Sequence, residues 1–356
     1  MKIAIDLSQI IYGTGVSNYR ENLVKNLLSI DSQNEYILFG GSFRRYNELK
    51  FKISSMGDGK VFPIPPRFAD LIWNKLHILP VEKLIGGIDV LHTSDWAEMP
   101  SRAFKVTTIH DLIPLLFPRL TPKIIVNTHK DRLEWVKKES DRIIVPSIAT
   151  KLDLIKYGFD EKKIRVIYEA PNFSKATAVQ IDQVKKKYGI HEDYIIAIGT
   201  NPRKNIQQMV DAYHLSKYGK NLKMLVVGEN KGLKIKDERG VRFLGHVNSD
   251  DLCALLTGSK VLVFASLYEG FGIPILEAYN CEVPVVTSNL SSMPESAGGA
   301  AVLVDPHDVN SIASGIEEAL NKSKSLIASG LKQVAKFSWE KTAHETLGVY
   351  EESNIK

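Results

Sequence analysis

The sequence predicts an α/β protein with two domains, each built on a parallel sheet. The chain has 356 residues, which is too long for one small domain and suits two domains that each bury a sizeable core. Short apolar runs, typical of strands buried on both faces, alternate with helical patterns along the chain. Strands that alternate with helices predict parallel sheets joined by right-handed crossovers.

The composition excludes several other classes of protein. Hydrophobic residues make up 44% of the chain and charged residues 24%, without an apolar run of the roughly 18 residues that a membrane span needs. Met1 leads directly into a strand-like segment and not into a secretory signal, so we expect a cytoplasmic protein. The two cysteines, Cys253 and Cys281, lie in no metal-binding spacing, which favours free thiols and no bound metal.

The chain carries a small excess of positive charge, which lies in its first half. Residues 1–170 contain 25 Lys and Arg against 20 Asp and Glu, and the formal net charge of the whole chain is +5. An excess of this size is more typical of a solvated surface than of a nucleic-acid interface, and no recognition module for DNA or RNA is present. We therefore expect no nucleic-acid partner.

Strands in the first half are predicted at residues 2–5, 36–39, 61–64, 90–91, 106–109 and 143–145. After the first of them, Gly13 and Gly15 form a glycine-rich turn into a helix, and backbone amides at such a helix start favour an anion. A tight turn without a ligand explains these two glycines equally well. Ser147, after the last of these strands, is expected to cap a helix.

Two histidines follow predicted strands. His110 and Asp111 end the segment VTTIHD, and His92 follows the strand at 90–91. A lone histidine at a strand end is usually structural, and Asp111 fits a turn cap. For His92 the structural role is favoured over a place in the wall of a cleft.

Residues 68–84 form an amphipathic stretch that contains Trp73, with Lys75 and Lys83 among its apolar residues and Arg67 directly before it. Most such stretches are helices that face the core. The alternative is that part of this stretch lies on a membrane surface, where basic residues are attracted to anionic lipid.

The second half begins after an aperiodic linker at residues 169–178. A buried strand at 194–198 leads to a turn with Arg203 and Lys204, just before a helix. Two cations beside a helix amino terminus suit a diphosphate, because the amides and the charges act on the same oxygens. Surface charge is the alternative explanation for the pair taken alone.

The most informative segment is residues 261–277, VLVFASLYEGFGIPILE. It predicts a buried strand, a turn built from Glu269, Gly270, Phe271 and Gly272, and a helix that carries Glu277. Both carboxylates would face the crevice at the carboxyl edge of the sheet, where open α/β sheets bind ligands. Helix capping or solvent exposure would account for either Glu alone.

The two acids and the Gly-Phe-Gly turn resemble the E-x7-E motif of retaining glycosyltransferases of family 4. The segments IHDLIPLLFP and GTNPRKN and the terminal FSWEKTAHETLGVYEE also resemble that family, especially its mannosyltransferase-like members. The resemblance implies the GT-B architecture, with two facing Rossmann-like domains and a final helix that crosses back to the first domain. The expected boundaries are residues 1–170, 171–335 and 336–356.

The resemblance also assigns roles to individual residues. It implies catalytic roles for His110, Lys204 and Glu269. It places the nucleotide-sugar donor against Gly13, Gly15, Arg203, Lys204, His246, Val247, Glu269, Gly270, Phe271, Gly272 and Glu277. One residue fewer than usual separates Thr200 from Pro202, so Lys204 is a firmer assignment than Arg203.

The implied reaction moves a sugar, with retention of configuration and without a metal or separate cofactor, to a glycan or lipid-linked saccharide acceptor. GDP-mannose is the preferred donor and a UDP-sugar is the alternative. A basic first half and an amphipathic stretch suggest peripheral contact with anionic membrane at the inner face. A nucleotide-sugar oxidoreductase or epimerase would need a G-x-G-x-x-G motif, and Gly15 is not followed by its third glycine. A subunit that binds sugar nucleotides without catalysis is the other alternative.

Overall fold

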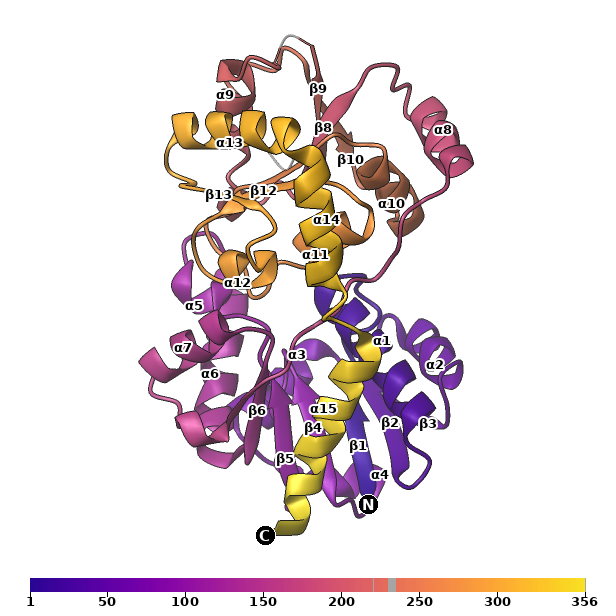
Figure 1. Cartoon of the computed structure of the whole chain (residues 1–356). Coiled ribbons are helices and arrows are strands. Elements are labelled where there is room, and N and C mark those ends of the chain that lie inside the picture. Colours follow the sequence, from indigo (N-terminus) through magenta and orange to yellow (C-terminus); the bar gives the residue numbers. More distant parts are fainter. Residues whose placement is uncertain (220, 230–234, 356) are drawn as a thin grey trace. The chain divides into compact units, whose positions relative to one another are not determined.

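The computed structural model describes residues 1–219, 221–229 and 235–355. The chain divides into two compact units, Met1–Glu169 together with Ser338–Lys356, and Ala170–Phe337 (Figure 1). The sequence placed the corresponding borders at residues 170 and 335.

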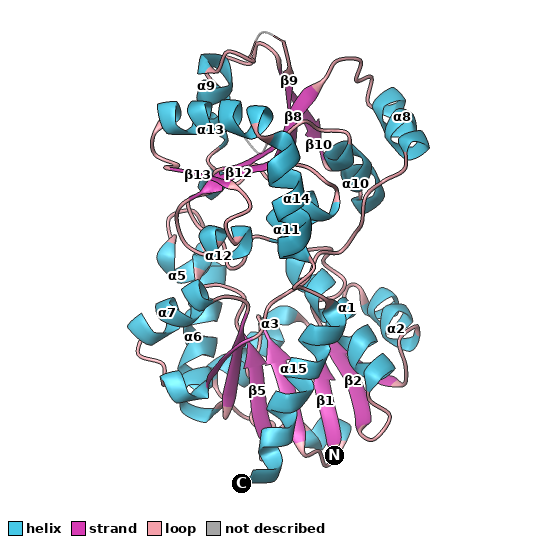
Figure 2. Ribbon diagram, viewed as in Figure 1, coloured by secondary structure: helices cyan, strands magenta, loops and turns pink. Residues whose placement is uncertain are grey.

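The first unit contains a seven-stranded sheet with the order β3-β2-β1-β4-β5-β6-β7, in which neighbouring strands are parallel (Figure 2). Its strands are β1 (Lys2–Asp6), β2 (Glu35–Gly41), β3 (Gly59–Phe62), β4 (Val90–Ser94), β5 (Phe104–Thr108), β6 (Arg142–Val145) and β7 (Ile164–Val166). The central strand β1 is an apolar run with Ile3 and Ile5 fully buried. Strand order reverses beside β1, and such a switch point leaves a crevice at the carboxyl ends of the strands.

The helices of the first unit are α1 (Gly15–Ile30), α2 (Tyr46–Ser54), α3 (Pro66–Ala69), the π-helix η1 (Asp70–Lys75), α4 (Glu82–Ile85), α5 (Ile113–Leu116), α6 (Lys123–Glu139), α7 (Ile148–Lys156) and α15 (Trp339–Glu351), with 3-10 turns at Glu161–Lys163 and Glu352–Ile355. Helix α1 begins at a capping box between Thr14 and Ser17. Ser147 caps α7, as predicted. In α15, Tyr350 is fully buried and lies with its hydroxyl 2.5 Å from His92 Nδ1. The final helix therefore packs on the first unit, and His92 is part of that packing.

The second unit contains a six-stranded parallel sheet with the order β10-β9-β8-β11-β12-β13. Its strands are β8 (Tyr194–Ile198), β9 (Lys223–Val227), β10 (Val241–Gly245), β11 (Leu262–Phe264), β12 (Val285–Ser288) and β13 (Val302–Val304). Its helices are α8 (Ala178–Lys187), the 3-10 turn η3 (Pro202–Lys204), α9 (Ile206–Leu215), α10 (Ser249–Thr257), α11 (Ile273–Asn280), α12 (Met293–Ala297), α13 (Val309–Asn321) and α14 (Ser323–Val334). Every side chain from Val261 to Ala265 is fully buried, so the strand predicted there is covered on both faces. The fold class predicted from the sequence is confirmed.

The structure corrects the interpretation of residues 68–84, which do not form one amphipathic helix. The short α3 widens into the π-helix η1, and the backbone then takes left-handed conformations at His77 and Leu79. The Trp73 side chain is only 5% exposed, and its indole N–H donates to the Leu79 carbonyl oxygen at 3.1 Å. Trp73 is therefore a core residue and not a membrane anchor. Within the described part of the chain, helices long and apolar enough to cross a bilayer are absent.

Candidate active site

A short turn at the carboxyl end of β8 holds two cations in place. Arg203 and Lys204 lie in η3, and Asn205 follows in a left-handed conformation before α9 begins. The Asn205 side-chain amide donates to the carbonyl oxygens of Ala265 and Pro306, at 3.2 and 2.7 Å. These two residues follow β11 and β13, so the turn is fixed across the carboxyl edge of the sheet.

Glu269 brings the two cations together. Arg203 Nη1 and Lys204 Nζ each lie 2.7 Å from Glu269 Oε1, and all three side chains are largely buried. Arg203 Nη1 also donates to the Tyr268 carbonyl oxygen, and Lys204 Nζ lies 4.4 Å from the centre of the Phe264 ring. Although the turn is one residue short, both cations reach the carboxylate.

The electrostatics of this cluster suit an anionic ligand. Burial alone would raise the pKa of the Glu269 carboxyl, but Lys204 and Arg203 outweigh burial and hold the pKa below its ordinary value. Glu269 is therefore ionised near neutral pH, and the three side chains together carry one net positive charge. The remaining positive charge lies beside the amino terminus of α9, in a region partly shielded from water.

Three serines fix the Glu269–Gly272 turn from its carbonyl side. The Ser291 and Ser292 hydroxyls lie 2.8 and 2.9 Å from the Glu269 carbonyl oxygen. Ser296 donates to the Phe271 carbonyl oxygen at 2.5 Å. These serines were not singled out from the sequence, where the local signal is the segment SSMPES that follows β12. Their bonds orient the peptide units between Glu269 and Gly272.

Glu277 lies in a different environment, on α11. Its side chain is buried, and Asn172 Nδ2 lies 3.3 Å from Glu277 Oε1. Burial raises the pKa of the Glu277 carboxyl to about 7, and the bonds to Asn172 only partly oppose this shift. Asn172 belongs to the segment that the sequence identified only as a linker. Burial and Asn172 dominate the environment of this carboxyl, which is placed to accept hydrogen bonds from ligand hydroxyls.

The two predicted base contacts follow the edge strand β10. His246 is exposed and Val247 is buried, directly after Gly245, which has a positive φ of 69°. Gly228, at the end of β9, donates its amide to the Gly245 carbonyl oxygen. Because the sheet is parallel, His246 and Val247 lie at the same edge as the Arg203, Lys204 and Glu269 cluster.

In the first unit, His110 lies just after β5, and its ring contacts Glu169 and Tyr19. His110 Nδ1 is 3.0 Å from Glu169 Oε1, and the Tyr19 ring packs edge-on with its centre 4.6 Å away. Burial lowers the pKa of His110, but the hydrogen bond to Glu169 and the charge of Asp95 outweigh it, so the pKa is above its ordinary value. Nε2 is buried and has no hydrogen-bond partner within the described ranges. It can therefore donate to a ligand.

Gly13 and Gly15 flank Thr14, the cap of α1, the same helix that carries Tyr19. Gly13 has a φ of 66°, which favours glycine, and both glycines are exposed. Glu169 and Tyr19 were not singled out from the sequence, because Glu169 lies 59 residues from His110. Both cysteines are free and buried, and a cluster of potential metal ligands is absent from the residues that the structure describes.

Both halves of the chain match models of glycosyltransferase families. The model of Glycosyltransferase Family 4 matches residues 13–172, and that of Glycosyl transferases group 1 matches residues 180–330. O-antigen chain mannosyltransferase B of Escherichia coli is 30% identical over 98% of this chain and 99% of its own. O-antigen chain mannosyltransferase RfbU of Salmonella typhimurium is 30% identical over 59% of each chain.

Solved structures agree on the fold. Sucrose-phosphate synthase of Thermosynechococcus elongatus superposes with a TM-score of 0.73 at 17% identity, covering 99% of this chain and 98% of that one. Anabaena HepE, in complex with UDP and glucose, also gives 0.73 at 15% identity, covering 99% and 100%. The fold is thus GT-B, the architecture of nucleotide-sugar glycosyltransferases. The chain belongs to glycosyltransferase family 4, in its mannosyltransferase-like group.

Proposed function

We propose that this glycosyltransferase moves mannose from GDP-mannose to a glycan or lipid-linked saccharide acceptor, with retention of configuration. The observation that carries the proposal is the cluster of Arg203, Lys204 and Glu269 at the carboxyl edge of the second sheet. Negative charge grows on the diphosphate as its bond to the sugar breaks. Cations that are already in place stabilise that charge without reorganisation. The reaction needs neither a metal nor a separate cofactor, since Arg203 and Lys204 supply the positive charge.

The remaining residues position the two reactants. His110 is oriented by Glu169 and offers Nε2 to a hydroxyl of the donor sugar. Gly270 to Gly272 contribute backbone amides to the sugar, and Glu277 accepts hydrogen bonds from the ribose hydroxyls. In front-face attack, the departing phosphate oxygen accepts the proton of the acceptor hydroxyl, so a separate carboxylate base is not needed.

A panel of sugar nucleotides tests the reaction class. Release of nucleoside diphosphate is measured with and without manno-oligosaccharide acceptors. A transferase releases more nucleoside diphosphate when an acceptor is present. An epimerase would change the sugar while it stays attached to the nucleotide, and a binding subunit would leave every donor intact.

The donor base is tested by comparing thermal stabilisation by GDP and UDP. The relatives named mannosyltransferases support GDP-mannose, whereas the neighbour solved with UDP keeps UDP-sugars as the alternative. A ligand at 100 times its Kd stabilises the folded state by about 2.7 kcal/mol, and a weaker ligand at the same concentration stabilises it less. We therefore expect GDP, the nucleotide of the proposed donor, to raise the unfolding temperature more than UDP. Stabilisation by UDP alone would overturn the choice of GDP.

We also propose peripheral contact with anionic membrane from the cytoplasmic side. In the corrected stretch, Leu76 and Ile78 are exposed, and Lys75, which lies 3.7 Å from Asp70 Oδ2, directly precedes Leu76. Arg67 lies earlier, at the start of the stretch. Each cation near an anionic surface contributes on the order of 1 kcal/mol, so attachment should be weak and sensitive to salt.

Vesicle co-sedimentation at several salt concentrations tests this contact. Wild type should bind anionic vesicles at low salt, and a Leu76→Glu, Ile78→Glu double variant should bind several-fold less. Phe51→Glu is the control, since Phe51 is exposed on α2 outside the stretch. Equal binding by the double variant, or no binding by wild type, would remove the membrane contact.

A further inference from the structure

The segment that joins the two units carries a bonded polar residue on each side of the border. The chain passes from the first unit to the second between Glu169 and Ala170. Glu169 bonds His110 of the first unit, with Oε1 3.0 Å from Nδ1. Three residues later, Asn172 bonds Glu277 of the second unit, with Nδ2 3.3 Å from Oε1. The proposed function gives His110 and Glu277 roles in donor binding, and it gives Asn172 none.

Asn172 donates two hydrogen bonds to the Glu277 carboxyl group. One comes from its side-chain amide and the other from its backbone N–H. Hydrogen bonds weaken steeply away from their preferred angles, so two donors from one residue restrict the rotation of the carboxyl group. The Glu277 side chain is buried whereas Asn172 is exposed, so Asn172 reaches the carboxyl group from its solvent side.

The residues that follow Asn172 are fixed to α10 and α11 by further hydrogen bonds. These bonds join the Asn280 side chain to the Phe173 carbonyl oxygen (3.4 Å), the Cys253 thiol to the Ser174 carbonyl oxygen (2.8 Å) and the Ala176 amide to the Thr257 hydroxyl (3.1 Å). Asn280 and Glu277 lie three positions apart on α11, and therefore on one face of that helix. The backbone path of the segment thus holds Asn172 beside Glu277.

The environment of Glu277 makes the bonds from Asn172 important for its ionisation. Burial raises the pKa of the Glu277 carboxyl to about 7, and the bonds from Asn172 oppose that rise. An ionised carboxylate accepts hydrogen bonds at both oxygens, whereas a protonated one has lost part of this capacity. Removing the bonds from Asn172 raises the pKa further, so a larger fraction of the carboxyl is protonated near neutral pH.

A neutral donor is suited to the position of Asn172. A cation there would pair with the Glu277 carboxylate and compete with ligand hydroxyls, and an acid would raise the pKa of Glu277 further. An ionised carboxylate has about four acceptor positions, and the two bonds from Asn172 use half of them. The remainder suits a pair of neighbouring hydroxyls, which is what a nucleotide ribose presents.

We propose that Asn172 is a positioning residue for the donor, which holds the Glu277 carboxylate in the orientation that accepts both hydroxyls of the nucleotide ribose. The proposal rests on the proposed function, because it depends on the binding of the donor ribose by Glu277. The joining segment thereby contributes to the selection of a ribonucleotide over a deoxyribonucleotide. Asn172 acts through Glu277 and not on the transferred sugar, so it changes donor affinity and not turnover at saturating donor.

Calorimetric titration with GDP at pH 7 tests the positioning role. Asn172→Ala should raise the Kd by about five- to tenfold, the scale of a lost hydrogen bond, while the kcat at saturating donor stays within about twofold of wild type. Asn172→Asp has nearly the same size but adds a negative charge beside Glu277, so it should weaken binding more than Asn172→Ala. Lys175→Ala is the control within the segment, because its ion pair with Glu282 is half exposed and should contribute little.

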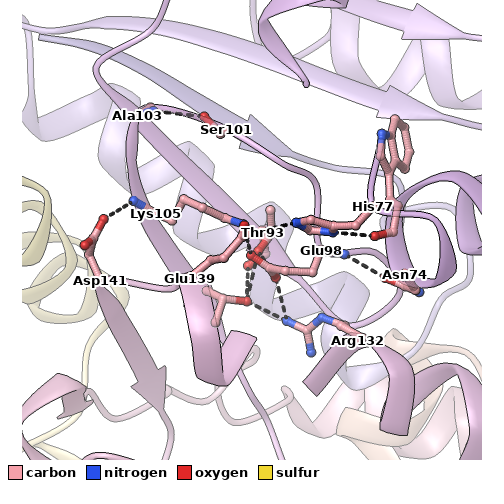
Figure 3. Close-up of polar contacts among 12 residues, drawn as sticks. Asn74, His77, Thr93, Glu98, Ser101, Ala103, Lys105, Arg132, Glu139 and Asp141 are labelled. Carbon is pink, nitrogen blue, oxygen red and sulfur yellow. Dashed lines mark hydrogen bonds and ion pairs between the residues drawn. The ribbon is translucent and has the colours of Figure 1, made fainter. Parts of the chain in front are cut away.

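A second control separates a specific effect from a general loss of stability. Asn74 is buried in the first unit, where its Oδ1 accepts from the Glu98 backbone amide at 3.0 Å (Figure 3). Asn74→Ala leaves that amide unpaired, so it should lower the melting temperature and keep the wild-type Kd for GDP. If Asn74→Ala weakens GDP binding as much as Asn172→Ala does, the effect is a loss of stability and the proposal fails. Should Asn74→Ala not fold, Lys175→Ala remains as the control.

Two further measurements distinguish positioning from a merely structural role. A GDP analogue that lacks both ribose hydroxyls should bind equally well to wild type and to Asn172→Ala, because it offers nothing for Glu277 to accept. On acidification, GDP affinity should fall at a higher pH in Asn172→Ala than in wild type, because the bonds that lower the pKa of Glu277 are gone. An equal loss of affinity for GDP and for the analogue would overturn the proposal.

The same titrations separate failure of this proposal from failure of the proposed function. They do not require sugar transfer, and they are repeated with UDP so that the choice of base does not decide the outcome. If transfer is intact but Asn172→Ala keeps the wild-type Kd, Asn172 is not a positioning residue. If Asn172→Ala loses affinity as expected but no sugar nucleotide is turned over, the ribose site stands and the proposed transfer fails. If wild type binds neither nucleotide, both proposals fail.

Discussion

Lys204→Ala is expected to lower turnover by about two to three powers of ten, the scale for removing one preorganised charge at a transition state. Lys204 Nζ lies 2.7 Å from Glu269 Oε1 and over the Phe264 ring, so its charge is held at the carboxyl edge of the sheet. Steady-state release of nucleoside diphosphate at saturating donor measures the effect.

The matched control is Lys260→Ala. Lys260 lies in the same unit and also forms an ion pair, with Asp193 at 3.1 Å, but it is half exposed and precedes β11. Its removal should leave turnover within about twofold, as is usual for an exposed pair. If Lys204→Ala retains near-wild-type turnover with an unchanged melting temperature, Lys204 is not part of the mechanism.

Glu277→Gln is expected to weaken donor binding by about 10- to 100-fold at pH 8, the range for hydrogen bonds to a charged group. The pKa of the Glu277 carboxyl is about 7, so at pH 8 wild type is mostly ionised. Below about pH 6 the wild-type carboxyl is protonated, and the affinities of the two proteins should converge. Calorimetric titration with nucleoside diphosphate across this range measures the difference.

Glu277→Gln should also make the folded protein more stable at pH 8, although it weakens donor binding. Because the folded-state pKa of Glu277 is raised, the folded protein binds the proton more tightly than the unfolded chain does. Wild type therefore loses stability as pH rises from about 4.5 to about 7, at roughly 1.4 kcal/mol per unit of pKa shift. Glu277→Gln has no such group and should melt at a higher temperature than wild type at pH 8.

Glu318→Gln, at a half-exposed position on α13, serves as the control for both measurements. It should follow wild type in donor affinity and in the pH dependence of stability. An equal loss of donor affinity by Glu277→Gln at pH 6 and pH 8 would contradict a neutral-range titration of Glu277.

Secondary structure could be predicted from the sequence where burial and turn-forming residues indicate the same element. The segment around β11 could be predicted because a short apolar run rich in β-branched residues is typical of a strand covered on both faces, and glycines mark the turn after it. The stretch at residues 68–84 could not, because its apolar spacing suits a helix. The π-helix and the left-handed His77 and Leu79 depend on contacts with distant residues, such as Glu98 and Glu139.

Parts of the candidate site could not be predicted either, because they also depend on contacts between residues that are distant in sequence. The strand order places β8 beside β11, which brings Arg203 and Lys204 to Glu269, and periodicity alone does not give that order. His110 likewise meets Glu169 from 59 residues further along the chain, so no local motif marks that pair.

Product analysis tests the central claim most directly. The protein is incubated with GDP-mannose and an α-manno-oligosaccharide, and the anomeric configuration of the new linkage is determined by NMR. The account predicts an acceptor extended by one mannose in α linkage, with stoichiometric GDP. A β-linked product would contradict retention, and an unchanged acceptor across the whole panel of sugar nucleotides and saccharides would contradict sugar transfer itself.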